Sequence, residues 1–163
     1  MTQARFEAFA ATYAEQHRPV WAYLVRLGAS RSVAEDLTQE VFVKWLNHAH
    51  SVDEPGQVRA FLFTAATRLL IDQWRRERRF VSWDSTVPVE SVAPAEDGMM
   101  SGKAWATLTQ REQQLLWLAY AEEFSHSEIA VITGLAPASI KVLLSRSRDR
   151  LRSGLMPAEG QND

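Results

Sequence analysis

Residues 124–152 read FSHSEIAVITGLAPASIKVLLSRSRDRLR, and this stretch decides the fold that we expect for the chain. Ser125 and Glu128 have the spacing of a capping box, which begins a first helix. Gly134 supplies a residue that tolerates a left-handed turn. Pro137 stands where a second helix would start, at a position that tolerates a missing N–H. The spacing predicts two helices joined by a tight turn.

The second of these helices has two unlike sides. An apolar stripe is formed by Ile140, Leu143, Leu144 and Leu151. The hydroxyl and basic residues lie elsewhere on the helix: Ser139, Lys141, Ser145, Arg146 and Arg148. A short helix, a glycine turn and a second helix with a basic open face are typical of a helix-turn-helix that reads DNA. An ordinary helical hairpin with a solvated basic face is the alternative.

The composition sets the broad class. The chain has 163 residues, enough for one domain or two small ones, and its hydrophobic content of 46% is normal for a globular protein. The absence of cysteine excludes disulfides and fits a reducing compartment. No apolar run is long enough for a membrane span, and the N-terminal MTQARFEAF is no signal peptide. We therefore expect a cytoplasmic protein without membrane insertion.

The charge is distributed unevenly along the chain. The net charge of -2 argues against a nucleic-acid partner, but residues 59–79 hold six arginines against two carboxylates. Residues 136–153 hold five basic residues against one carboxylate, and residues 80–101 between these segments are acidic. Two basic segments separated by an acidic connector predict two contacts with a polyanion, because phosphate neutralisation is local. Solvated charged faces would produce the same pattern.

The N-terminal half predicts three helices. The first covers residues 3–27. Pro19 can interrupt it, and Gly28 ends it. The second covers about 32–48 and begins with a Ser32–Glu35 capping box. A loop at 48–58 precedes the third, at about 57–79. Leu, Phe and Trp faces allow the three helices to close one core within residues 1–79.

The second predicted helix carries a candidate docking surface. Its core side holds Ala34, Leu37, Val41 and Trp45, and its opposite side holds Asp36, Gln39, Glu40, Val43 and Asn47, with Phe42 beside it. This side is either a docking surface or a solvated face. A catalytic pair at Asp36 and Glu40 is disfavoured, because a regular exposed helix gives neither carboxylate a special environment. His48 and His50 near Asp53 are weak evidence for a metal site, because a pair of histidines in a loop lacks the further ligands that a metal needs. We expect no catalytic residues, no metal and no cofactor, hence no enzyme.

The rest of the chain completes a two-domain, all-α architecture. Residues 80–101 predict a flexible linker. Helices are expected at 102–108 and 110–122, the second begun by a Thr109–Glu112 capping box, with a packed apolar set of Trp105, Leu108, Leu115, Leu116, Leu118 and Tyr120. The predicted domains are thus residues 1–79 and residues 102–153, followed by a frayed tail at 154–163.

Three segments in this order resemble a known family. AEDLTQEVFVKW (34–45), RAFLFTAATRLLIDQWRRERR (59–79) and LTQREQQLLWLAYAEEFSHSEIAVITGLAPASIKVLLSRSRDRLR (108–152) resemble the extracytoplasmic-function (ECF) sigma factors, small bacterial sigma factors that keep only regions 2 and 4. The resemblance covers residues 5–152. The phrase FLFTAATRLLIDQWRRE also resembles the iron-uptake (FecI-like) branch of the family.

The resemblance implies a role for each segment. Residues that match the positions docking on core polymerase are Asp36, Leu37, Gln39, Glu40 and Phe42. Residues that match the segments opening and reading the −10 promoter element, including a pocket for a flipped base, are Asn47, Arg59, Phe61, Arg75, Arg76, Arg78 and Arg79. Residues on the helix that matches the reader of the −35 element are Pro137, Ser139, Lys141, Ser145, Arg146 and Arg148.

The resemblance therefore implies an alternative sigma factor for promoter-specific initiation. Its implied partners are core RNA polymerase (the beta-prime clamp helices and the beta subunit), promoter DNA and an anti-sigma factor. Two departures are an arginine at Arg68, where the family commonly has asparagine, and Ala136 in place of a serine cap, which weakens the helix start by about 1 kcal/mol. A dimeric helix-turn-helix regulator that never binds polymerase is the alternative, and it leaves AEDLTQEVF without a task.

Overall fold

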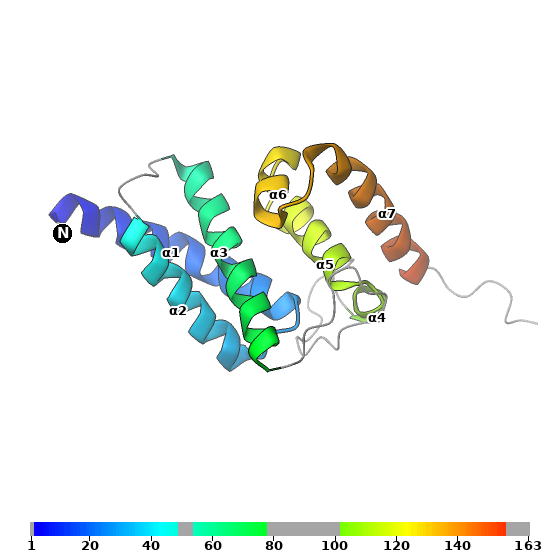
Figure 1. Ribbon diagram of the computed structural model, residues 1–163, viewed down its shortest axis with the longest axis horizontal. Helices are drawn as coiled ribbons and strands as arrows, with labels where there is room; N and C mark the ends of the chain where they lie inside the picture. The colour runs from blue at the N-terminus through cyan, green and yellow to red at the C-terminus, as the bar shows by residue number, and fades with distance from the viewer. Residues whose placement is uncertain (1, 49–53, 78–101, 156–163) are drawn as a thin grey trace, which may run out of the picture. The chain divides into compact units, whose positions relative to one another are not determined.

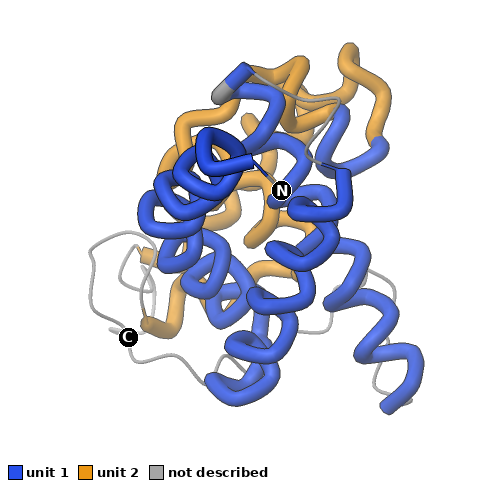
Figure 2. The backbone as a smooth tube through the Cα atoms, turned by 90° about the vertical axis from the view of Figure 1, so that its left-hand side faces the viewer, with its two compact units in different colours: residues 1–80, 131–134 blue, residues 81–130, 135–163 orange. Residues whose placement is uncertain are grey.

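The fold is helical in each of its two parts (Figure 1). The computed structural model describes residues 2–48, 54–77 and 102–155, and the regular elements within these ranges are helices. This confirms the all-α prediction. The described chain divides into two compact units, coloured separately in Figure 2. The first holds α1, α2, α3 and residues 131–134, and the second holds the remaining residues from α4 onward.

The first unit is a three-helix domain made of α1 (Gln3–Arg26), α2 (Arg31–His48) and α3 (Pro55–Arg76). Each helix turns an apolar stripe inward, and the stripes meet in one core. The fully buried members are Val20, Tyr23, Leu24, Ala34, Val41, Leu62, Phe63, Ala66 and Leu70. A buried hydrogen bond of 2.8 Å joins the Tyr23 hydroxyl to Thr67 Oγ1 across this core, which satisfies two polar groups away from water.

Three features of these helices differ from the prediction. α1 runs through Pro19 without a break, because the burial of Val20, Tyr23 and Leu24 in the following turn offsets the lost hydrogen bond and the steric cost of the proline ring. α2 is capped by Ser30, whose Oγ accepts from the Val33 N–H at 3.3 Å, so the predicted Ser32–Glu35 box is wrong. α3 starts at Pro55, inside the predicted loop, since proline suits the first turn of a helix.

The C-terminal part of the chain consists of short helices followed by one long helix, on which α4 and α5 pack. The short elements are α4 (Gly102–Ala106), α5 (Gln110–Leu116), the π-helical turn η2 (Trp117–Ala121) and α6 (His126–Thr133), and the long helix is α7 (Pro137–Leu155). The predicted Thr109–Glu112 capping box is confirmed, with both of its hydrogen bonds present. α7 ends at Leu155 and so extends two residues into the predicted tail at 154–163. Residues 78–101 and 156–163, which include the predicted linker, lie outside the described ranges.

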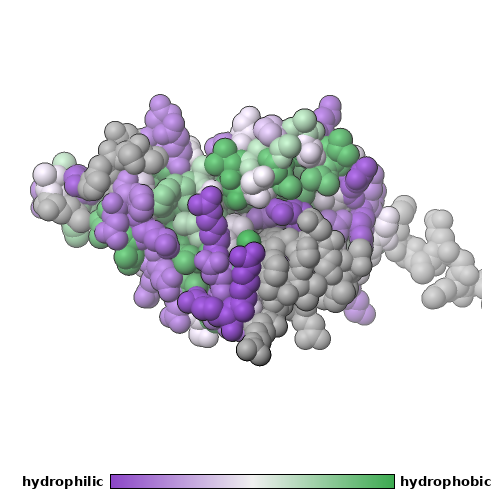
Figure 3. Space-filling view, in the orientation of Figure 1, coloured by the Kyte–Doolittle hydropathy of each residue, from purple (hydrophilic) through white to green (hydrophobic). Residues whose placement is uncertain are grey.

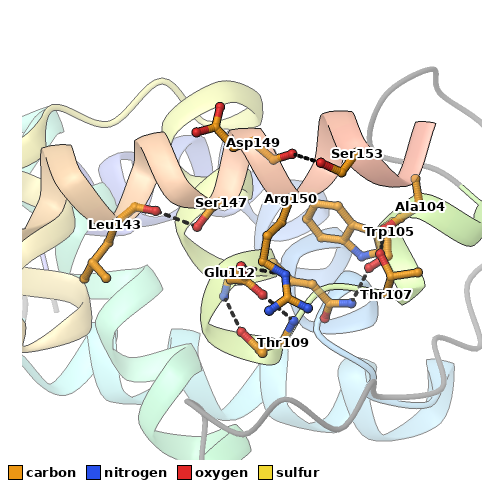
Figure 4. A network of polar contacts seen from close by, with 11 residues as sticks. Ala104, Trp105, Thr107, Thr109, Glu112, Leu143, Ser147, Asp149, Arg150 and Ser153 are labelled. Atoms are coloured by element: carbon orange, nitrogen blue, oxygen red, sulfur yellow. Dashed lines mark hydrogen bonds and ion pairs between the residues drawn. The ribbon is translucent and has the colours of Figure 1, made fainter. Parts of the chain in front are cut away.

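α7 is held by an apolar stripe and by one ion pair. Ile140, Leu144 and Leu151 are buried on the side that packs on α4 and α5. Figure 4 shows Arg150 of α7 reaching Glu112 of α5, with 3.4 Å between Nε and Oε2. Ser147 takes a buried place in the stripe and donates to the Leu143 carbonyl at 2.7 Å, whereas Leu143 itself is only half-buried. The predicted stripe is thus shifted from Leu143 toward Ser147.

The π-helical turn exposes Tyr120, which the sequence predicts in the packed apolar set. In an α-helix Tyr120 would lie on the same face as the buried Leu116. The Glu122 N–H instead bonds to the Trp117 carbonyl five residues back, at 3.1 Å. The wider turn changes the facing of the side chains, and Tyr120 is 47% exposed.

α6 and α7 have the local geometry of a helix-turn-helix. The Ser125–Glu128 capping box is present, with hydrogen bonds of 2.9 and 3.2 Å. Gly134 adopts a φ of +75° in the turn, and α7 then begins at Pro137. Within the described residues no single helix is long and apolar enough to cross a membrane; only α6 and α7 taken together meet that test, and they are bent by 97°.

We predict that Gly134→Ala destabilises the protein at the turn between α6 and α7 by about 1 kcal/mol, because a side chain is strained at positive φ even where it has room. A Cβ built at Gly134 meets no atom within 4 Å, so the loss isolates the backbone conformation. Scanning calorimetry of the full chain measures it as a lower Tm. Gly134→Asn is the matched control and should lose less, since asparagine visits this conformation more readily. Equal Tm values for Gly134 and Ala would contradict the account.

Candidate nucleic-acid and partner interfaces

The exposed face of α2 holds three of the five residues predicted to dock on polymerase. Asp36, Gln39 and Glu40 are exposed there, beside the exposed Val43. Leu37 and Phe42 are only 2% exposed, because their positions on the helix face the core. They therefore support the face from beneath and leave three polar side chains to make direct contacts.

An aromatic ridge on α1 lies next to this face. The Phe42 ring packs edge-on against Tyr13, with ring centroids 4.9 Å apart, and Tyr13 stacks on His17, also at 4.9 Å. A hollow of about 380 Å³ is lined by Tyr13, His17 and Trp21 of α1 and by Glu35, Thr38 and Gln39 of α2. Aromatic residues at helical spacing are expected to pack in the core, yet Phe6 and Tyr13 of α1 are exposed. The available signal was the i, i+4 spacing of Phe9, Tyr13 and His17.

The end of α2 and the start of α3 meet in an aromatic cluster. The Phe61 ring lies 6.0 Å from Trp45 and 5.6 Å from His48, measured between ring centroids. Asn47, also predicted for −10 recognition, is exposed on the adjacent last turn of α2. His48, a weak metal candidate by sequence, belongs instead to this aromatic cluster. Flat rings at such a place can stack on an unpaired base.

The predicted phosphate-binding arginines separate into two groups. Arg75 and Arg76 are exposed at the C-terminal end of α3, where Figure 3 shows hydrophilic surface. The Arg59 guanidinium lies 6.0 Å from the centroid of the Phe63 ring and is half-buried. Arg78 and Arg79 lie outside the described residues. Among the described arginines of this predicted set, Arg75 and Arg76 are therefore the exposed ones.

The predicted −35 set lies on α7 outside its buried stripe. Pro137, Lys141, Arg146 and Arg148 are exposed, and Ser139 and Ser145 are half-buried. All six lie off the buried stripe, so the structure gathers them on the accessible part of one helix. This arrangement offers cations and hydroxyls to a nucleic-acid backbone and groove.

Tyr120 of η2 contacts one member of this set, Arg148. Arg148 Nη1 donates a 2.7 Å hydrogen bond to the hydroxyl of Tyr120, which the π-helical turn η2 exposes. The bond restricts the long arginine side chain to fewer conformations. Tyr120 is thus a positioning residue for Arg148, and only the π-helical turn makes the contact possible.

The described residues contain no group of three or more His, Cys, Asp or Glu side chains that could hold a metal ion. Of the three residues considered for metal binding, His50 and Asp53 lie outside the described ranges. His48 contacts Phe61 and bonds to the Lys44 carbonyl at 2.9 Å through Nδ1.

Comparison with known proteins identifies both units. Residues 12–80 match the family model for sigma-70 region 2, and residues 103–151 match the model for sigma-70 region 4. ECF RNA polymerase sigma factor SigL of Mycobacterium tuberculosis is 29% identical, over 87% of this chain and 85% of the relative. SigM of Bacillus subtilis is 28% identical, over 82% of this chain and 86% of the relative.

A solved structure agrees with these matches. The sigma factor RpoE of Bartonella quintana, determined in complex with the anti-sigma factor NepR, superposes with a TM-score of 0.73 at 29% identity. The match covers 91% of this chain and 97% of that one. With region 2 followed by region 4 in one helical chain, the protein belongs to the ECF sigma factors, alternative sigma factors that direct transcription initiation.

We predict that Tyr120→Phe weakens the affinity for promoter DNA about two- to fivefold, because Arg148 loses its hydrogen-bond partner while the ring stays in place. Fluorescence anisotropy with the holoenzyme and a labelled promoter fragment measures the change. Arg148→Ala should cost more, and Tyr120→Phe should have no further effect in that background. An additive loss in the double variant would show that the two residues act separately.

Proposed function

We propose that this chain docks on core RNA polymerase through α2 and reads a promoter at two elements, the −35 element through α7 and the −10 element through α2 and α3. The observation that carries the proposal is the orientation of α7. Its apolar stripe is buried, and Lys141, Arg146 and Arg148 are left on the accessible sides. An N-terminal part of such a helix fits the major groove, with cations beside the phosphates.

The docking role of α2 rests on its three exposed polar residues. Asp36 and Glu40 are one helical turn apart, so their carboxylates point the same way and favour a basic or hydrogen-bonding partner. The hollow beside Gln39 adds aromatic surface from Tyr13 and Trp21 to the same region, together with polar and charged groups. Together these features support contact with the clamp of core polymerase, where the resemblance places this segment.

The −10 role rests on the aromatic cluster and the arginines of α3. His48 and Phe61, which lie against the buried Trp45, offer ring surface near Asn47, and extruding a base costs a few kcal/mol that stacking can offset. Arg75 and Arg76 would hold the backbone. Because both units would be tethered to one polymerase, neither DNA contact needs to be strong alone.

A further partner, an anti-sigma factor, is proposed by analogy with a relative. Bartonella quintana RpoE binds the anti-sigma factor NepR, and we propose that an anti-sigma factor likewise holds this chain inactive by covering its interfaces. A polymerase subunit works in the bacterial cytoplasm, which is where we expect the protein. Membership of the iron-uptake branch stays a prediction that rests on FLFTAATRLLIDQWRRE alone.

Transcription with purified core polymerase tests the whole proposal. Core polymerase with this protein should fire a defined subset of a genomic promoter library that core polymerase alone does not fire. The absence of both new transcripts and a complex with core polymerase would contradict it. Binding to a palindromic operator without polymerase would favour the dimeric regulator instead.

We predict that the double variant Asp36→Asn, Glu40→Gln loses about tenfold or more in affinity for core polymerase, because both docking carboxylates lose their charge. Surface plasmon resonance on immobilised core measures it. Asp72→Asn on α3 is the matched control, since it removes an exposed carboxylate from another helix of the same unit. Circular dichroism should be unchanged in all three proteins. Unaltered core affinity would remove the assignment of this face.

We also predict that Arg75→Gln with Arg76→Gln lowers the salt dependence of promoter binding. Each lost phosphate contact reduces the slope of log affinity against log salt by about 0.7 to 0.9. Titrations of the holoenzyme at several salt concentrations should therefore show a slope smaller by about 1 to 2. Arg68→Gln, an exposed change in the middle of the same helix, is the control. An unchanged slope would exclude phosphate contact by this pair.

A further inference from the structure

Val142 is an exposed apolar residue on the helix that carries the −35 set. It is 50% exposed, although valine is a residue that proteins usually bury. Ile140 and Leu144, two positions before and after it, are buried against the rest of the unit. At about 100° per residue, a position two steps from each of them lies on the opposite side of the helix. Val142 is therefore the outermost side chain of this part of α7.

The neighbours of Val142 form an ordered surface. Ala138, one turn earlier, and Ser145, nearly one turn later, are small and share the outer ridge with it. Lys141 flanks the ridge on one side and Arg146 on the other, and both are exposed. Figure 3 shows hydrophobic surface over the start of α7. The helix thus presents a narrow apolar ridge with a cation at each edge.

This arrangement matches the cross-section of a DNA major groove. Phosphates line the two rims of the groove and base edges form its floor, so flanking cations reach the rims while the central ridge faces the bases. Most base edges are polar there, and an apolar side chain pressed against them would leave hydrogen-bonding groups without water. The C5-methyl group of thymine is the apolar exception.

We infer that Val142 is a specificity-determining residue that contacts the C5-methyl of a thymine in the −35 element. The inference rests on the proposed function, because it needs α7 to lie in the major groove. The small side chain of Ala138 leaves room for the close approach that the contact requires. Lys141 and Arg146 hold the helix in place through the backbone, and Val142 selects the base.

Uracil scanning of the promoter tests the inference. A promoter fired by the holoenzyme is synthesised with each thymine of the −35 element replaced in turn by uracil, which pairs identically and lacks the methyl group. One replacement should lower the affinity of the wild-type holoenzyme about three- to tenfold, in keeping with a buried methyl contact. With Val142→Ala, the same replacement should have an effect of less than twofold.

Arg148→Ala is the control variant. It should weaken binding to every fragment while leaving the uracil penalty at its wild-type size, because its effect is on the backbone contact. A promoter that is bound and fired without any uracil-sensitive position, or a penalty that persists in Val142→Ala, would overturn the inference and leave the proposed function standing. Failure of the holoenzyme to bind any promoter would overturn both.

Discussion

The burial of one side of α7 is the constraint on which the proposed DNA-binding surface depends. Ile140, Leu144 and Leu151 pack on α4 and α5, and the Arg150–Glu112 ion pair lies at the edge of that contact. A rotation of α7 by one residue would turn the stripe about 100° away from its partners and bring charged groups toward the core. The packing of the second unit therefore determines which side chains can enter a groove.

The capping box at Thr109 and the π-helical turn η2 are part of the same arrangement. The cap begins α5 at a defined residue, which places Glu112 where Arg150 reaches it. The π turn then directs Tyr120 outward, where it accepts a hydrogen bond from Arg148. Two interactions thus link α7 to the α5–η2 segment, one to a carboxylate and one to a phenol. The π-helical turn thus restrains Arg148, a cation on the helix that we propose reads DNA.

The first unit carries an acidic pair and a basic pair on different helices. Asp36 and Glu40 are exposed on α2, and Arg75 and Arg76 are exposed at the end of α3. The net charge of -2 averages over these opposite surfaces and describes neither. A domain that has to meet a polymerase subunit and a DNA backbone needs such a division, because one sign of charge would repel one of the two partners.

Local chemistry made much of this molecule predictable from its sequence. Apolar periodicity, two capping boxes, Gly134 and Pro137 determine the helices and the turn, since these signals act between residues a few positions apart. The tertiary structure alone places Phe42 beneath the proposed docking face, exposes Tyr13 and lets Tyr120 restrain Arg148. Those outcomes depend on which distant helices approach and on a single wider helical turn. No periodic pattern in the sequence encodes either.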